Sequence, residues 1–137
     1  VHAVQLSVFI VAGFAVVLSP WRAALVPPYV KHARAALGAR NQFMVQGLHR
    51  TRDRTGVLIY VSVAERTVEI LADQGINDKV DPSVWHQAVE EFTRNLKAGR
   101  IADGFLKAIE DCGNVLIRHV PRRDTDVDEL PDRLIEI

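Results

Sequence analysis

Four aspartates could take part in chemistry, because carboxylate oxygens are the ligands that hard divalent cations prefer. Asp73, Asp78 and Asp81 lie close together in the chain, with Asn77 between them. Asp103 could join them if the two predicted helices place it beside the other three aspartates. These residues predict a calcium or magnesium site. The alternative is a set of solvated turn residues, because the spacing differs from an EF-hand loop and Asp81 is placed to cap a helix.

The histidines and the single cysteine give no catalytic pattern. No two of the five histidines are three or four positions apart, and none lies in a known nucleophile motif. His86 follows Trp85 on the polar side of a predicted helix, where we expect a surface residue. Cys112 lies on a predicted core stripe, which favours a buried and inert thiol. We therefore predict no catalytic residue and no cofactor-binding motif.

Composition narrows the class of protein. The 137 residues carry 17 basic and 17 acidic side chains. A balanced charge, without a basic strip among aromatic residues, argues against a nucleic-acid partner. One cysteine excludes an intrachain disulfide and CxxC metal sites. The length allows one ordinary domain with an appendage.

The aspartates follow a predicted β-hairpin, which must position them. Its strands cover 57–63 and 67–72 and are joined by a short polar turn. Both faces of the first strand are largely apolar, so we expect it to be covered on both sides. The second strand is more one-sided, as expected nearer an edge. A further short strand is predicted at 134–137.

Two helices are predicted after the hairpin. Asp81 and Pro82 are typical of a helix start and Gly99 of a helix end, so the first helix reaches about residue 98. The second covers 101–119. The predicted buried face of the first helix consists of Trp85, Ala88, Val89, Phe92 and Leu96. The predicted core stripe of the second consists of Ile101, Phe105, Ala108, Ile109, Cys112 and Leu116.

A basic, alanine-rich helix is predicted upstream of the hairpin, over 29–52. Its predicted apolar face consists of Val30, Ala33, Leu37, Met44 and Leu48. The opposite face carries Lys31, Arg34, Arg40 and Arg50. The helix either covers the sheet or rests on anionic lipid headgroups, and both can hold for different ends of it.

The segment 3–21 is apolar and free of charged residues, which predicts a transmembrane helix in contact with membrane lipid. Trp21 and Arg22 at its end form the pattern found at a membrane surface. The alternatives are a buried core helix and the apolar part of a signal peptide. The cations that follow predict an inner-membrane protein whose C-terminal domain lies in the cytoplasm. We accordingly divide the chain into a membrane segment with its flank, 1–27, and a domain, 28–137.

Several stretches resemble the TPM domain family, which includes thylakoid acid-phosphatase-like and photosystem II repair proteins. They are TGVLIYVS at 55–62, RTVEI at 66–70, the Gly75–Ile76 turn and KAGRIADGFLKAI at 97–109. The similarity covers about 54–120, and QFMVQGLHRT at 42–51 and the ending 129–137 resemble a bacterial membrane-bound branch.

The resemblance implies an α/β layered sheet with helices on both faces, preceded here by the N-terminal transmembrane helix. The family's first helix and strand lie upstream of the matching part, so we expect an incomplete sheet with an open strand edge. The strand at 134–137, or a second copy of the chain, would cover that edge.

Three hypotheses for function follow, and the second of them is the one that the resemblance implies. The first is a membrane-anchored, non-catalytic adaptor or assembly factor whose partner is a membrane protein. The second is a divalent-metal-dependent phosphatase, with calcium or magnesium held by Asp73, Asp78, Asp81 and Asp103. A third hypothesis is a structural domain that self-associates into a homo-oligomer through its open edge.

Overall fold

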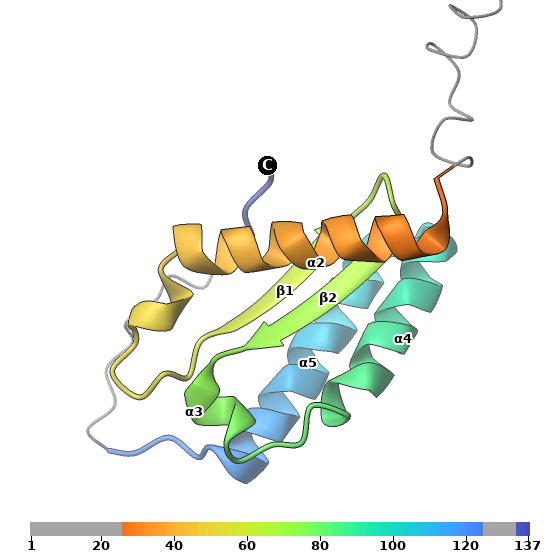
Figure 1. Cartoon of the computed structure of the whole chain (residues 1–137). Helices are drawn as coiled ribbons and strands as arrows, with labels where there is room; N and C mark the ends of the chain where they lie inside the picture. The colour runs from red at the N-terminus through yellow and green to blue at the C-terminus, as the bar shows by residue number, and fades with distance from the viewer. Residues whose placement is uncertain (1–25, 125–133) are drawn as a thin grey trace, which may run out of the picture.

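The computed structural model describes residues 26–124 and 134–137. Figure 1 shows a two-stranded sheet with one helix across one face and two helices on the other, so the domain is mixed α/β in three layers. The expected helices on both faces are therefore confirmed. In chain order, the elements are α2 (Pro28–Val45), the short 3-10 helix η2 (Leu48–Arg50), β1 (Val57–Ser62), β2 (Thr67–Ala72), α3 (Gln74–Asn77), α4 (Val84–Lys97) and α5 (Ile101–His119).

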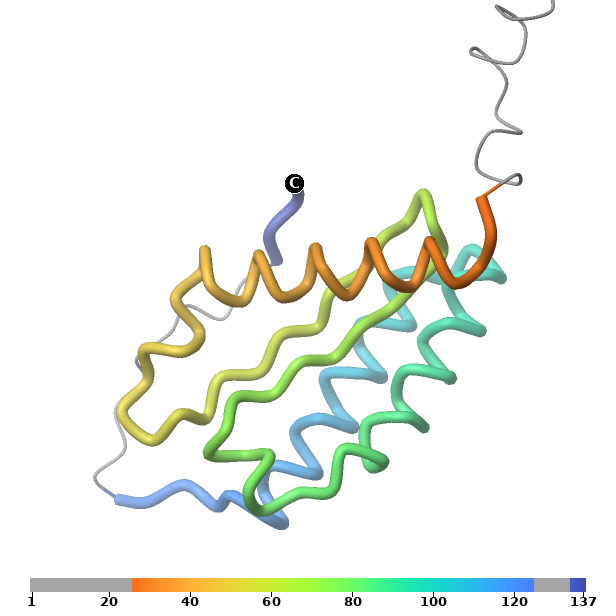
Figure 2. The backbone as a smooth tube through the Cα atoms, viewed as in Figure 1, coloured from red at the N-terminus to blue at the C-terminus, as the bar shows by residue number. Residues whose placement is uncertain are grey.

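The hairpin is antiparallel, with Val57 opposite Ala72 and Ser62 opposite Thr67. The predicted strands are confirmed, although β1 ends one residue early. Arg66 in the turn has a positive φ of 52°, which tightens the reversal. Figure 2 shows the two strands running side by side between the helical layers. In the described part of the chain the sheet consists of these two strands.

The core lies between the hairpin and the pair α4 and α5. Phe92 of α4 is 1% exposed and packs edge-on against Phe105 of α5, with ring centroids 4.8 Å apart. Gly104 allows this approach, because a Cβ atom there would run into the Phe92 ring. The buried residues of α4 are Trp85, Ala88, Phe92 and Leu96, as the sequence predicts.

The face of α2 that packs on the sheet differs from the predicted one. Ala35 and Ala39 are 1% and 0% exposed, whereas Leu37 and Met44 are 70% and 57% exposed. The small residues bring the helix backbone close to the sheet, and the Tyr60 hydroxyl lies directly below Gly38. The prediction was wrong because it selected the large apolar residues, and these point outward.

Two further predictions are wrong. Ile109 is 58% exposed, because it lies on the flank of α5 away from the core. Residues 134–137 form no strand and are exposed, so they do not cover a sheet edge. The predicted transmembrane segment, 3–21, lies outside the described residues. Within the described part, no helix is long and apolar enough to cross a membrane.

Candidate functional site

The four aspartates do not form one cluster. Asp73 is buried at the end of β2, Asp78 is exposed at the end of α3, and Asp103 is exposed in the first turn of α5. Asp81 accepts a hydrogen bond from the Ser83 backbone N–H over 2.8 Å, in the turn that leads into α4. Over residues 26–124 and 134–137, no group of three or more His, Cys, Asp and Glu residues could hold a metal ion. Metal binding at these aspartates stays a prediction.

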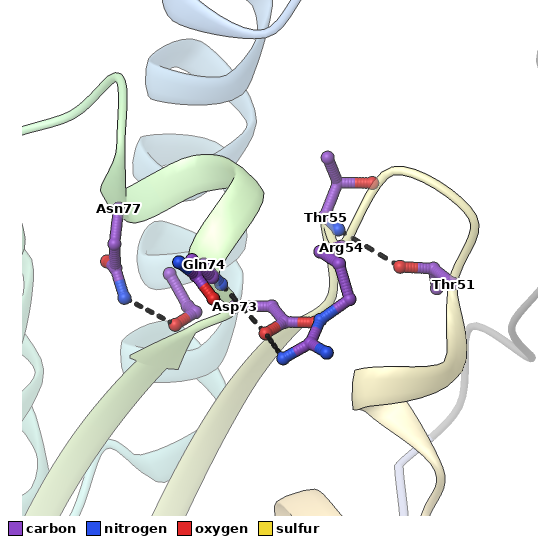
Figure 3. Close-up of polar contacts among 7 residues, drawn as sticks. Thr51, Arg54, Thr55, Asp73, Gln74 and Asn77 are labelled. Atoms are coloured by element: carbon purple, nitrogen blue, oxygen red, sulfur yellow. Dashed lines mark hydrogen bonds and ion pairs between the residues drawn. The ribbon is translucent and has the colours of Figure 1, made fainter.

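Asp73 instead forms a two-point ion pair with Arg54 (Figure 3). Arg54 Nε lies 2.8 Å from Asp73 Oδ2, and Nη2 lies 2.9 Å from Oδ1. Asp73 Oδ1 also accepts the Gln74 backbone N–H over 2.7 Å, which caps the start of α3. The Asp73 side chain is 5% exposed and that of Arg54 is 50% exposed.

The backbone holds this ion pair in place. Arg54 has a positive φ of 55°, and its carbonyl accepts the Gly75 N–H over 2.9 Å. A Cβ atom at Gly75 would run into the Asp53 carbonyl, so the approach requires glycine. On the other side, Thr51 Oγ1 accepts the Thr55 N–H over 3.0 Å. The ion pair therefore joins the segment before β1 to the segment after β2.

The pKa of Asp73 is lowered although its carboxyl is buried. Burial favours the neutral acid and would raise the pKa, but the hydrogen bonds from Arg54 and Gln74 and the charge of Arg54 outweigh that effect. A carboxylate held in this way is a weak proton acceptor. Asp73 is therefore suited to joining two chain segments and is a poor general base.

A groove of about 390 Å³ runs along β2, on the side away from β1. Its floor is β2, and side chains of α2 and α4 contribute to its lining. The lining mixes polar and apolar groups and includes His32, Asn77, Trp85, His86, Val89 and Thr93. We call this feature the β2 groove.

The Trp85 side chain in the β2 groove has an unused hydrogen-bond donor. Trp85 is 5% exposed, and its Nε1 is buried with no partner among the described residues. His49 Nδ1 is in the same condition, but His49 is not among the residues that line the groove. A buried donor without an acceptor costs about 1–3 kcal/mol.

Backbone groups of β2 also face the groove. Asp73 N donates to Gly56 O over 2.9 Å, and bonded pairs alternate with outward-facing pairs in an antiparallel ladder. Val68, Ile70 and Ala72 therefore direct their N–H and C=O groups away from β1. The Ala72 carbonyl accepts from Asn77 Nδ2 over 2.8 Å, in agreement with this alternation.

The sequence predictions missed both features. Trp85 was predicted to be buried, but a helical pattern does not show which buried indole lacks an acceptor. Arg54 gave no local signal, because Asp73 is 19 residues away. The signal that could have found it is the hairpin itself, since its register brings the residues flanking the two strands together.

Comparison with known proteins identifies the family. The TPM domain model matches residues 25–115. Among solved structures, the chain is similar to the NMR structure of the BA42 protein from the psychrophilic bacterium Bizionia argentinensis, with 33% identity and a TM-score of 0.64. That match covers 71% of this chain and 67% of the other. No curated protein was found to match. The chain therefore belongs to the TPM domain family.

Proposed function

We propose that this chain is a non-catalytic adaptor or assembly factor for membrane proteins. In this proposal residues 3–21 anchor it in the bacterial inner membrane, and the TPM domain lies in the cytoplasm. The observation that carries the adaptor role is the β2 groove with the unpartnered Trp85 indole N–H. The occupant is an extended segment of a membrane-protein partner.

An extended segment fits the chemistry of the groove. A strand placed beside β2 would pair with the outward backbone groups of Val68 and Ile70. The Trp85 N–H would donate to a carbonyl of the same segment, and Val89 and the indole ring would contact its side chains. Backbone pairing supplies affinity with little dependence on sequence, which suits a factor that handles more than one partner.

The outward face of α2 supports the membrane placement. Tyr29 is 74% exposed, and the large apolar residues Leu37 and Met44 are exposed as well. Arg34 and Arg40 are exposed on the same helix. Exposed apolar side chains together with cations on one helix are typical of a helix that lies in the membrane–water interface.

The first test is site-specific photo-crosslinking in living bacteria with the full chain. The photoreactive residue replaces Thr93, which lines the groove, or Arg94, which is exposed next to it and does not line the groove. We expect the Thr93 position to crosslink to an extended segment of an integral membrane protein and the Arg94 position not to do so. Equal yields at both positions would count against the groove.

The second test uses a synthetic peptide with the crosslinked sequence. In NMR titrations we expect shifts of the Val68 and Ile70 amides and of the Trp85 indole. A Trp85→Phe variant keeps an aromatic side chain, although a smaller one, and loses the donor, so we expect about tenfold weaker binding, with circular dichroism to verify the fold. Unchanged affinity in Trp85→Phe would remove the indole from the proposal.

A phosphatase assay separates the two activities. The adaptor proposal predicts no hydrolysis of p-nitrophenyl phosphate with calcium or magnesium. Metal-dependent hydrolysis that is lost in Asp78→Asn would instead establish the phosphatase, and Asp78 is exposed, so the variant is expected to fold. For topology, a cysteine at Arg40 in a Cys112→Ala chain should react with an impermeant maleimide only after the inner membrane is permeabilised.

A further inference from the structure

The outward side of α2 carries apolar side chains and a cation in one line. Tyr29, Leu37 and Met44 are 74%, 70% and 57% exposed, and Ala33 and Arg40 are exposed as well. These residues follow one another at spacings of three or four positions, so they share one side of the helix. We call these five residues the α2 outer face.

The packing of α2 on the sheet turns this face outward. Ala35 and Ala39 are buried, and each lies about half a helical turn in angle from Leu37. Gly38 lies close to the Tyr60 hydroxyl of β1, on the inner side of the helix. Figure 1 shows α2 across the sheet on the side opposite to α4 and α5. The large apolar side chains of α2 are therefore kept out of the core and are available to a surface outside the domain.

The layer that contains α2 is basic. Residues 28–52 include five Lys and Arg residues and no Asp or Glu, whereas residues 84–119, on the other side of the sheet, include five basic and five acidic residues. Arg34 borders the α2 outer face with its side chain 64% exposed, and it lies 4.0 Å from Glu65 in the hairpin turn. A domain with one basic side and one neutral side turns its basic side towards an anionic surface.

We propose that the α2 outer face docks the domain on the surface of a bilayer that contains anionic lipid. Arg34 and Arg40 lie level with the lipid phosphates in this arrangement. Leu37 and Met44 enter the boundary between headgroups and acyl chains. Tyr29 suits the same depth, because its ring is apolar and its hydroxyl is polar. An anionic bilayer thus matches the cations and the apolar side chains of one helix face at the same time.

The docking surface consists of described residues of α2, and it does not involve the β2 groove. The inference rests on the proposed function only in placing the chain at a membrane. With α2 flat on the lipid, α4 and α5 face away from the bilayer, because they lie on the opposite side of the sheet. The lipid contact therefore sets the orientation of the whole domain.

The first experiment places an environment-sensitive fluorophore on the full chain in lipid nanodiscs. Cys112 is replaced by alanine, and a single cysteine is placed at Leu37 or at Leu106. Leu106 is the matched control, because it is the same residue type on α5 and is 68% exposed, against 70% for Leu37. The discs contain phosphatidylcholine, alone or mixed with phosphatidylglycerol. We expect nitroxide groups near the lipid headgroups to quench the L37C probe in the mixed discs and to leave the L106C probe unquenched.

The second experiment removes charge. In the L37C chain, Arg34→Gln with Arg40→Gln is compared with Arg94→Gln and Arg118→Gln, which are exposed on α4 and α5. We expect the first pair to lower the ratio of docked to undocked domain about thirtyfold, because each cation near an anionic surface contributes about fivefold. The second pair removes the same charge and is expected to change nothing. Circular dichroism of every variant verifies the fold.

Three results overturn the proposal. They are equal quenching of the Leu37 and Leu106 probes, equal quenching at Leu37 with and without phosphatidylglycerol, and equal effects of the two charge pairs. An unquenched L37C that resists an impermeant maleimide would also overturn it and would assign the α2 outer face to a protein partner.

Carbonate extraction separates this inference from the proposed function. A chain that stays in the membrane in carbonate while Leu37 is unquenched is anchored without docking of α2, which overturns the inference alone. Quenching at Leu37 in a chain that carbonate releases supports the docking and contradicts the anchor at residues 3–21.

Discussion

Arg54 is the residue whose side chain ties the start of the hairpin to its end. It lies before β1 and bonds through two nitrogens to Asp73, the first residue after β2. Because Asp73 is buried, loss of Arg54 leaves its carboxylate in the interior, where the bond from Gln74 is the one that remains among the residues the structure describes. The loss in free energy of unfolding is therefore set by the unpaired Asp73 carboxylate, and it exceeds the contribution of an ordinary surface ion pair.

We expect Arg54→Met to lower the free energy of unfolding by more than Arg40→Met does, because two hydrogen bonds to the buried Asp73 carboxylate are lost, although solvent screens the half-exposed arginine. Urea unfolding followed by circular dichroism measures the change. Arg40→Met is the matched control, because Arg40 is exposed on α2, and surface changes stay within about 0.5 kcal/mol. Equal stability of both variants would show that the ion pair contributes little.

The pH dependence of stability follows from the lowered pKa of Asp73. In the unfolded chain an aspartate titrates near about pH 3.9, so the ion pair stabilises the fold fully above that pH. This contribution is lost as the pH falls through the lower, folded pKa. In Arg54→Met the burial of Asp73 remains while the hydrogen bonds and charge of Arg54 are gone, so the pKa of Asp73 rises and we expect a smaller loss of stability on acidification than in the wild type. Unfolding free energies from neutral pH down to about pH 2 test this.

At the scale of elements, α2 shows how small residues can carry the packing. Ala39 is fully buried against the hairpin, while Leu37, two positions away, is largely exposed. We expect Ala39→Leu to lower the unfolding free energy by about 1–3 kcal/mol through overpacking. Leu37→Ala should change it by less than about 0.5 kcal/mol. Thermal unfolding of the two variants compares the two faces of α2. If Leu37→Ala were the more destabilising variant, the face predicted from the sequence would be the one that packs on the sheet.

The hairpin, α4 and α5 could be predicted because their signals are local. Alternating apolar residues, the proline after Asp81 and the glycine at 99 mark these elements within a few positions. The buried side of α2 could not be predicted in the same way, since alanine at Ala35 gives almost no hydrophobic signal. Ile109 was misassigned for the opposite reason, because a stripe of apolar residues does not say which side meets the sheet.

The candidate site could be predicted only in part. Asp73 was identified by its residue type, but its partner depends on the hairpin register and its chemistry on burial. The β2 groove arises from α2, β2 and α4 together, and no stretch of sequence contains it. The family, by contrast, was identified from short stretches that stand in the right order, and the family match confirms it.

At the scale of the whole molecule, Cys112 reports on opening of the core. It is the single cysteine of the chain, and it is 5% exposed between α5 and the hairpin. Burial, with a smaller effect from the charge of Asp111, raises the pKa of its thiol to about 11. The reactive thiolate is therefore scarce at neutral pH while the protein is folded.

We expect Cys112 to react with a disulfide reagent only as fast as the core opens. The rate should approach that of a free thiol in denaturant and should rise in parallel with the destabilisation in Ala39→Leu. Spectrophotometric thiol assays over a range of urea concentrations measure it. Rapid reaction of the folded wild-type chain would show that α5 opens independently of the rest.

The packing between elements also bears on how quickly the chain folds. β1 pairs with β2, α4 pairs with α5, and α2 lies on the hairpin that follows it, so each main contact joins segments that are close along the chain. Such local topology shortens the search for native contacts, and mixed domains of this kind fold within about milliseconds to a second. The hairpin can dock on α2 before α4 and α5 are in place, so the domain can assemble in the order in which a ribosome releases it.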